Sequence, residues 1–308
     1  MARLSTAILA VFLAASAHAD APAGLRTRYG YDLSSLSGRI ASSWAALSYD
    51  RANRELFMVD RSQGIVHVFT DLGIETYSFG DESDIGTIIG AVPLESGELL
   101  LLTSVGRTWA LWRCNFRGEP IAKIEIKGLP EGFAKDFAPN ALQRAAGRTF
   151  LADKGGMKVL VTDDAGATVA TYELRDLLQF DKRHREDAMS GFNVDRDGSL
   201  LITVSPMFQA FVVSPKGEVR RFGTHGSVPG RFNIVGGIAT DEKGNYLVTD
   251  LLRAVVMVFD REFEFLGEFG YRGDDPENLL GPMDLVAANG KIFVAQSGNR
   301  GVKVFRYE

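Results

Sequence analysis

The sequence predicts an all-β protein, a six-bladed β-propeller in which an N-terminal strand completes the last blade. Three observations favour this fold class. A pattern of turn and strand residues recurs six times, short apolar segments bounded by turn residues fill each repeat, and the last repeat lacks its fourth segment.

The repeat is marked by three positions at fixed distances. A turn glycine is followed six residues later by a polar or small residue and nine residues further on by an apolar one, as in Gly244, Asp250 and Phe259. The first marker stands at positions 54, 97, 147, 198, 244 and 290, with Arg54 in place of glycine in the first unit. Successive units are therefore 43 to 51 residues apart, a period typical of propeller blades that bury their faces against their neighbours.

Each unit has room for four short strands. Segments such as "YLVTD" and "VVMVFD" are rich in β-branched and aromatic residues and end at clusters of Gly, Asp, Asn and Pro. In the fifth unit we expect strands over about 234–240, 245–249, 254–259 and 263–269. Residues 173–187 alone look helical, and there we expect a long surface loop with one helical turn.

The ends of the chain predict how the ring closes. The last unit stops three residues after Phe305, where the other units continue into a fourth strand such as "EFEFLGEF". Residues 24–33, "GLRTRYGYDL", precede the first unit and belong to no blade. We expect this segment to pair as the missing outermost strand, because an unpaired edge would otherwise be exposed.

The N-terminus resembles a secretory signal peptide. Arg3, an apolar stretch from Ala7 to Ala15 and the small-residue site at Ala17–Ala19 predict cleavage near Ala19 and a secreted, periplasmic product. Residues 20–308 would form a single domain. No later segment approaches the roughly twenty apolar residues of a membrane span, so we expect no transmembrane segment.

Composition excludes several function classes. With 34 basic and 39 acidic residues the net charge is −5, which argues against nucleic-acid binding by the whole surface. Cys114 is the only cysteine, so the chain can form no intramolecular disulfide and no thiolate zinc cluster. We expect a monomer without a cofactor.

A resemblance to a known family is clearest in the last third of the chain. The stretches "GIATDEKGNYLVTDLLRAVVMVFDREFEFLGEFG" and "GPMDLVAANGKIFVAQSGNRGVKVF" are similar to the repeats of NHL-type six-bladed propellers. Blades two to four keep the spacing but lack the strand-ending aspartate in "LLTSVGRTWALW" and "LITVSPMFQAFVV". The resemblance implies a non-catalytic binding scaffold that holds a protein or peptide partner on its loop face.

The turns between second and third strands predict which residues form that face. Five of the six turns carry basic residues, and the sixth carries two apolar ones. The predicted binding residues are Arg61, Arg107, Trp109, Lys154, Met207, Phe208, Arg253 and Arg300, with Lys158 beside Lys154. We expect a cationic rim around an apolar patch of Trp109, Met207 and Phe208, suited to an acidic partner. The alternative is that the arginines pack along their own blades.

Catalysis is the competing interpretation. The strand-ending carboxylates Asp60, Asp153 and Asp250 are expected to accept backbone hydrogen bonds in the following turns rather than to converge on one site. The remaining alternative is a calcium-dependent hydrolase of the gluconolactonase type that acts on a lactone or ester, with Asn140 in "FAPNAL" and Asp284 in "GPMDLV" as metal ligands. The first blade has Ser43 and Trp44 where that family has a glutamate.

Overall fold

The structure is a computed structural model that describes residues 27–35, 38–40, 42, 45–80 and 84–307. The predicted signal peptide with its cleavage site, and the positions of Ser43 and Trp44, lie outside the described residues.

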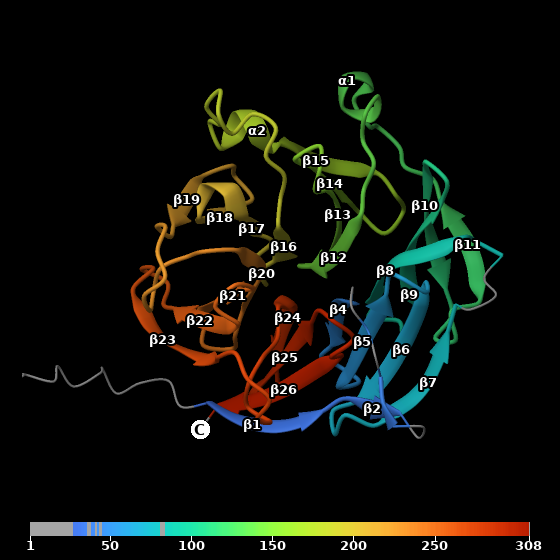
Figure 1. Ribbon diagram of the computed structural model, residues 1–308. Coiled ribbons are helices and arrows are strands. Elements are labelled where there is room, and N and C mark those ends of the chain that lie inside the picture. The colour runs from blue at the N-terminus through green and yellow to red at the C-terminus, as the bar shows by residue number, and fades with distance from the viewer. Residues whose placement is uncertain (1–26, 36–37, 41, 43–44, 81–83, 308) are drawn as a thin grey trace, which may run out of the picture.

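Six four-stranded antiparallel sheets are arranged as blades around a central axis (Figure 1). Blade 1 contains β4 (Ala45–Asp50), β5 (Glu55–Asp60), β6 (Ile65–Thr70) and β7 (Glu75–Phe79). Blade 2 contains β8 (Thr87–Pro93), β9 (Leu99–Val105), β10 (Thr108–Cys114) and β11 (Pro120–Ile124). Blade 3 contains β12 (Ala141–Ala145), β13 (Arg148–Asp153), β14 (Lys158–Thr162) and β15 (Thr168–Glu173).

The second half of the ring repeats this plan. Blade 4 contains β16 (Gly191–Val194), β17 (Leu200–Val204), β18 (Gln209–Val213) and β19 (Val219–Phe222). Blade 5 contains β20 (Val235–Thr240), β21 (Tyr246–Asp250), β22 (Val255–Phe259) and β23 (Phe265–Gly270). Blade 6 contains β24 (Pro282–Ala288), β25 (Lys291–Gln296), β26 (Val302–Tyr307) and, from the other end of the chain, β1 (Thr27–Asp32). The predicted fold class is confirmed, and the strands of blade 5 fall within two residues of their expected bounds.

The turn marker of the repeat has a common backbone conformation. Gly244 has a φ of 87°, and Arg54, which replaces glycine at the same place in blade 1, has a φ of 57°. This left-handed conformation costs glycine little and a residue with a side chain more. The spacing therefore recurs because each blade makes the same tight turn between its first two strands.

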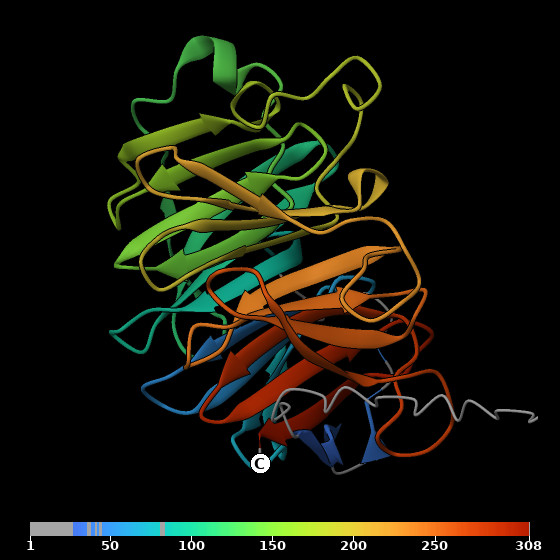
Figure 2. The ribbon, with the colours of Figure 1, turned by 90° about the vertical axis from the view of Figure 1, so that its left-hand side faces the viewer.

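The ring is closed by β1. It pairs antiparallel with β26, with Thr27 opposite Tyr307 and Tyr29 opposite Phe305. The rings of Tyr29 and Phe305 meet edge to face with centroids 6.2 Å apart. In the side view (Figure 2) the blue N-terminal strand lies beside the red strands of blade 6. The predicted clasp is confirmed, and a short pair of β2 (Ser34–Ser35) and β3 (Gly38–Arg39) follows it.

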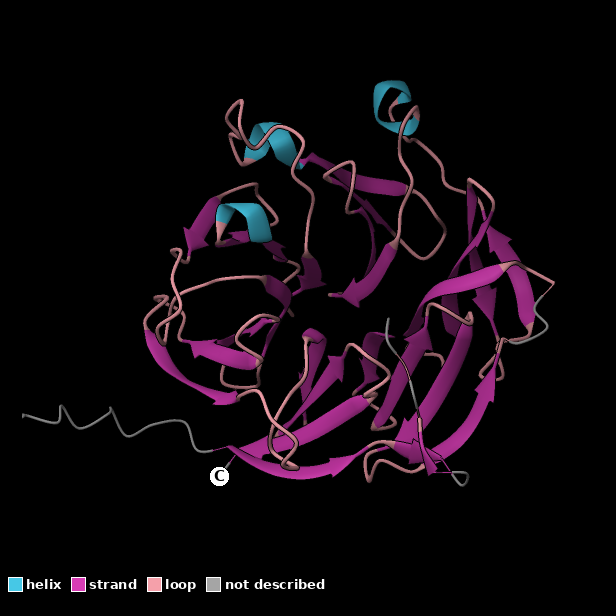
Figure 3. Cartoon of the chain, in the orientation of Figure 1, coloured by secondary structure: helices cyan, strands magenta, loops and turns pink. Residues whose placement is uncertain are grey.

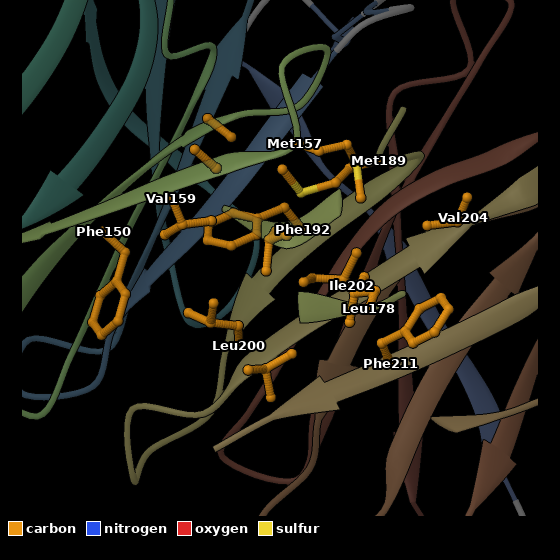
Figure 4. Packing of buried hydrophobic residues seen from close by; sticks show 14 of the residues in the cluster. Phe150, Met157, Val159, Leu178, Met189, Phe192, Leu200, Ile202, Val204 and Phe211 are labelled. Atoms are coloured by element: carbon orange, nitrogen blue, oxygen red, sulfur yellow. The ribbon is translucent and has the colours of Figure 1, made fainter. Parts of the chain in front are cut away.

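Apolar side chains fill the spaces between blades. The cluster between blades 3 and 4 contains Phe150 and Val159 on one side and Leu200, Ile202 and Phe211 on the other (Figure 4). Each fully buried side chain of this size stabilises the fold by roughly 1.5–3 kcal/mol. Cys114 is buried and free, so packing between blades holds the ring.

The helical segments are short, and those between blades lie at the edge of the ring in Figure 3. They are α1 (Glu131–Ala134), α2 (Leu174–Leu177) and the single 3-10 turn η1 (Ser205–Met207). α2 is the helical turn expected within residues 173–187, whereas α1 and η1 were not predicted because one turn leaves no periodic pattern. No helix among the described residues is both long enough and apolar enough to cross a bilayer.

The strand-ending aspartates hold the turns that follow them. Asp60 Oδ1 accepts the backbone N–H of Ser62 at 2.9 Å, and Asp250 Oδ1 accepts that of Arg253 at 3.0 Å. Asp153 Oδ1 accepts the N–H of Gly156 at 2.7 Å. The expected structural role of these carboxylates is confirmed.

Candidate binding site in the channel

The first strand of each blade lines the central channel, and small residues allow the blades to approach there. A Cβ added at Gly191 would lie 2.1 Å from the carbonyl oxygen of Gly236 in the next blade, so only glycine fits at this position. The channel has a cavity at each mouth. One, the loop-face cavity, opens where the crossovers between blades enter the innermost strands.

The loop-face cavity has a volume of about 190 Å³. Its polar lining consists of Arg61, Gln143, Lys154, Ser190 and Asp284. Its apolar and backbone walls come from Ala45, Ala46, Leu47, Gly90, Ala91, Ala141, Leu142, Gly191, Phe192 and Met283. Charged groups therefore converge from blades 1, 3 and 6 within a mainly apolar wall, a composition typical of ligand pockets.

The turns after β5 and β13 place the two cations. Arg61 follows Asp60 directly, Lys154 follows Asp153 directly, and in both blades the aspartate fixes the turn so that the next side chain points toward the axis. Lys154 Nζ donates to the carbonyl oxygen of Ser190 at 2.5 Å. The Nε–H of Arg61 is buried and has no hydrogen-bond partner among the described residues. An unsatisfied buried donor of this kind is costly.

Asp284, near the start of β24, supplies the negative charge. Its Oδ2 accepts the backbone N–H of Leu47 in blade 1 at 3.0 Å, and its Oδ1 accepts that of Leu285 at 3.0 Å. The bond from Leu47 joins the inner edges of blades 6 and 1. The carboxylate is therefore held in place by backbone.

Burial opposes every charge in the cavity. It lowers the pKa of Lys154 from 10.5 to about 8; nearby Arg61 lowers this pKa further, whereas Asp284 opposes the change. Burial also lowers the pKa of Arg61 and raises that of Asp284. The site thus contains two cations and one anion, with desolvation left uncompensated for at least one cation.

The residues around Asp284 do not fit a calcium ion. Calcium takes six to eight oxygen ligands, but here the carboxylate faces two cations and its oxygens accept backbone N–H groups. Asn140 is exposed, and its side-chain oxygen accepts the backbone N–H of Lys154 at 3.2 Å. No group of three or more His, Cys, Asp or Glu side chains suited to a metal occurs among the described residues.

The residues of the predicted cationic rim lie in different surroundings in the structure. The Arg253 side chain is only 11% exposed and pairs with Glu268 at 2.5 Å, so it packs along its own blade, as the alternative interpretation holds. Arg300 pairs with Asp274 at 3.5 Å, and Lys158 pairs with Glu173 at 3.6 Å. Arg107 is exposed at its turn. Only Arg61 and Lys154 line the cavity.

The expected apolar patch is not one surface. Trp109 packs between blades 2 and 3, where its Nε1–H donates to the carbonyl oxygen of Phe137 at 3.2 Å. Met207 packs on the cluster between blades 3 and 4. Phe208 packs on the cluster between blades 4 and 5 and lies against His225 with ring centroids 4.1 Å apart. The three side chains therefore pack against three different blade interfaces.

One positional signal would have found the channel residues. The residue directly after the strand-ending aspartate is Arg61, Lys154 or Leu251, and a Cβ at Gly236 would meet the Leu251 side chain. The third residue after the aspartate, such as Arg253, instead follows the blade. Gln143 was missed because nothing in its local sequence marks the axis.

Comparison with known proteins supports the architecture. A streptogramin B lyase matches with a TM-score of 0.56 and 11% identity over 94% of this chain and 89% of that one. A luciferin-regenerating enzyme matches with a TM-score of 0.61 and 13% identity over 92% and 95%. A candidate gluconolactonase matches with a TM-score of 0.57 and 15% identity over 93% of both.

These similarities establish the six-bladed propeller fold alone, since identity is so low. The sequence matches no family model, and no curated protein matches it.

Proposed function

We propose that the protein is an exported binding scaffold that captures a carboxylate group in the loop-face cavity. The group would be carried by an acidic peptide or protein partner or by a small organic acid. The observation that supports this most directly is the imbalance in the cavity. Arg61 and Lys154 are two desolvated cations beside a single fixed carboxylate, and the Arg61 Nε–H lacks a partner among the described residues.

A bound carboxylate would correct this imbalance. It would accept the free N–H of Arg61, where charge-assisted hydrogen bonds are strong and often bidentate. It would also place a second negative charge beside Lys154 and so favour the protonated amine. Asp284 would remain as the counter-charge of the two cations.

The size and walls of the cavity limit the ligand. A cavity of about 150 Å³ holds a benzene molecule, so about 190 Å³ admits a carboxylate with a few carbon atoms. Ala91, Leu142 and Phe192 present apolar surface to those carbons. A larger partner would insert one acidic side chain and rest the remainder on the surrounding turns.

Calcium-dependent hydrolysis is not part of this proposal, because Arg61 and Lys154 face the carboxylate that would have to bind the metal. We place the protein's action outside the cytoplasm on the strength of the sequence of residues 1–19. Sequencing the N-terminus of the exported protein tests that assignment.

Isothermal titration calorimetry with two probes tests the binding proposal. Glutarate represents the small acid, and the amidated peptide acetyl-Ala-Ala-Glu represents an acidic side chain. We expect at least one to bind, and Lys154→Met to weaken it at least about tenfold, the loss of one charge-assisted hydrogen bond. Lys216→Met, in an exposed turn of blade 4, is the matched control and should bind normally.

The two probes distinguish the sources of the carboxylate. Binding of glutarate indicates a small-molecule ligand, and binding of the peptide alone indicates a protein partner. If neither probe binds, or if Lys154→Met and Lys216→Met behave alike, the loop-face cavity is not a carboxylate site.

A further inference from the structure

The opposite mouth of the channel contains a larger cavity, of about 390 Å³. All six blades contribute to it, mainly through the turns that join their first and second strands. Three arginines from three blades lie in its lining: Arg51 in blade 1, Arg144 in blade 3 and Arg196 in blade 4. We call this cavity, with these arginines, the arginine mouth. Gln143 lines both cavities and marks the boundary between them.

Two carboxylates in the lining do not balance the three guanidinium groups. Asp50 is committed to its own turn, because it accepts the N–H groups of Ala52 at 2.8 Å and Asn53 at 3.1 Å. Glu95 is exposed. The lining therefore contains three guanidinium groups and two carboxylates, although the whole chain carries −5.

The other carboxylates near the arginines lie outside the lining. Arg51 pairs with Glu242 at 3.3 Å, and its side chain is 44% exposed. Arg144 pairs with Asp164 at 2.7 Å, and the Asp164 side chain is 65% exposed. The exposed Arg51–Glu242 pair contributes little and competes weakly with a ligand. Arg144, by contrast, is only 13% exposed and donates to both carboxylate oxygens of Asp164, at 2.7 and 3.3 Å, so a ligand would share it with Asp164.

Arg196 is the arginine of this mouth whose guanidinium has the fewest partners. Among the described residues its guanidinium has no hydrogen-bond or ion-pair partner, whereas its backbone N–H is bonded to Asp195. Its charge acts on Arg51 across the mouth: after burial, Arg196 is the next largest cause that lowers the pKa of Arg51. Arg196 is exposed, and an anion between it and Arg51 would offset the repulsion of these like charges.

We propose that the arginine mouth is a second ligand site, which binds a compact multivalent oxyanion between Arg51, Arg144 and Arg196. Planar guanidinium groups donate in pairs to phosphate and carboxylate oxygens. Three of them that converge from different blades suit a phosphate group or a tricarboxylate better than a single carboxylate. The site is separate from the loop-face cavity and does not depend on its ligand.

Calorimetry at low ionic strength with inorganic phosphate and with citrate tests this inference. We expect at least one anion to bind, and Arg196→Gln and Arg51→Gln each to weaken it about tenfold. Arg117→Gln, at an exposed outer turn of blade 2, is the matched control and should leave affinity unchanged. Lys154→Met should also leave it unchanged, which separates this site from the loop-face cavity.

The two anions identify the ligand class: binding of phosphate indicates phosphate or a phosphate ester, and binding of citrate alone indicates a polycarboxylate. If neither binds, the arginine mouth is not an anion site. Equal affinities for Arg196→Gln and Arg117→Gln would also overturn the inference, because binding would then follow overall charge rather than these arginines. Circular dichroism of each variant excludes misfolding as the cause of a loss.

Discussion

Both mouths of the channel contain positively charged side chains, but these side chains differ in their burial and in their partners. At the loop-face cavity Arg61 and Lys154 follow the second strand and lie among apolar walls beside the partly buried carboxylate of Asp284. At the arginine mouth the cations lie at or just after the end of the first strand. Arg51 and Arg144 pair with carboxylates outside the lining, and Arg196 is exposed. A desolvated cation requires a partner, whereas a hydrated one tolerates its absence. Burial, rather than the number of basic residues, therefore distinguishes the two sites.

The largest effect should come from Arg61. Arg61→Gln removes the guanidinium whose Nε–H has no partner in the part of the chain that the structure describes. We therefore expect the affinity for the bound carboxylate probe to fall about a hundredfold, as for a truncated buried charge pair. Arg107→Gln removes an equally cationic but exposed residue of the predicted rim and should have no effect. Calorimetry measures both. Comparable losses in the two variants would instead support a cationic rim without a specific cavity.

The next largest difference between the two mouths should be in how their ligand affinities depend on pH. The pKa of Lys154 is lowered to about 8, so the amine is protonated below pH 8 and neutral above it. Carboxylate affinity at the loop-face cavity should fall about tenfold per pH unit above pH 8, with proton uptake on binding near pH 8. Citrate affinity at the arginine mouth should stay constant from pH 7 to about 9, because guanidinium groups remain charged. Titrations in buffers of different ionisation enthalpy measure the proton uptake; its absence would contradict the assignment of Lys154.

A smaller effect tests the role of Asp284. Asp284→Asn removes the negative charge that opposes an incoming carboxylate, so we expect affinity for the probe to rise several-fold by relief of like-charge repulsion. Citrate binding at the other mouth should not change. A calcium ligand would behave in the opposite way, with loss of metal-dependent binding or activity. Weaker carboxylate binding by a correctly folded Asp284→Asn variant would show that Asp284 positions the cations.

The smallest effect concerns stability. A lysine whose pKa is below its unfolded value destabilises the fold while it is protonated, and this penalty disappears as the pH rises from about 8 to above 10.5. Lys154→Met should therefore raise the Tm at pH 7 by a few degrees, roughly the shift that 1 kcal/mol produces in a domain of this size. Arg196→Gln should leave the Tm unchanged. Thermal melts followed by circular dichroism compare the two; a lower Tm for Lys154→Met would mean that its contact with Ser190 outweighs the desolvation.

The architecture could be predicted because every blade repeats the same local structure. The spacing from Gly244 to Asp250 to Phe259 records a tight turn, a strand end and a packed strand, and all three depend on nearby residues. The clasp was also predictable, because the last repeat lacks a strand that residues 27–32 could supply. Short elements such as α1 leave no comparable pattern.

The site could be predicted only in part. Arg61, Lys154 and Asp284 were identified separately, but as rim cations and a metal ligand, because one sequence does not show that turns 93 residues apart face the same axis. The direction of each side chain depends on its position within a turn, as the difference between Arg61 and Arg253 shows. The arginine mouth was missed altogether, since Arg51, Arg144 and Arg196 share no local motif.

The shared sixth blade has a consequence for the order of folding. Thr27 pairs with Tyr307, so the contact that completes the ring joins residues 280 positions apart. Bringing such distant segments together carries the largest loop-closure entropy in the chain, and folds that depend on remote pairings form slowly. During synthesis the strand of residues 27–32 must wait, unpaired, until the final blade has emerged. The ring therefore stays open while the chain is made and closes only when the last strand of blade 6 is available.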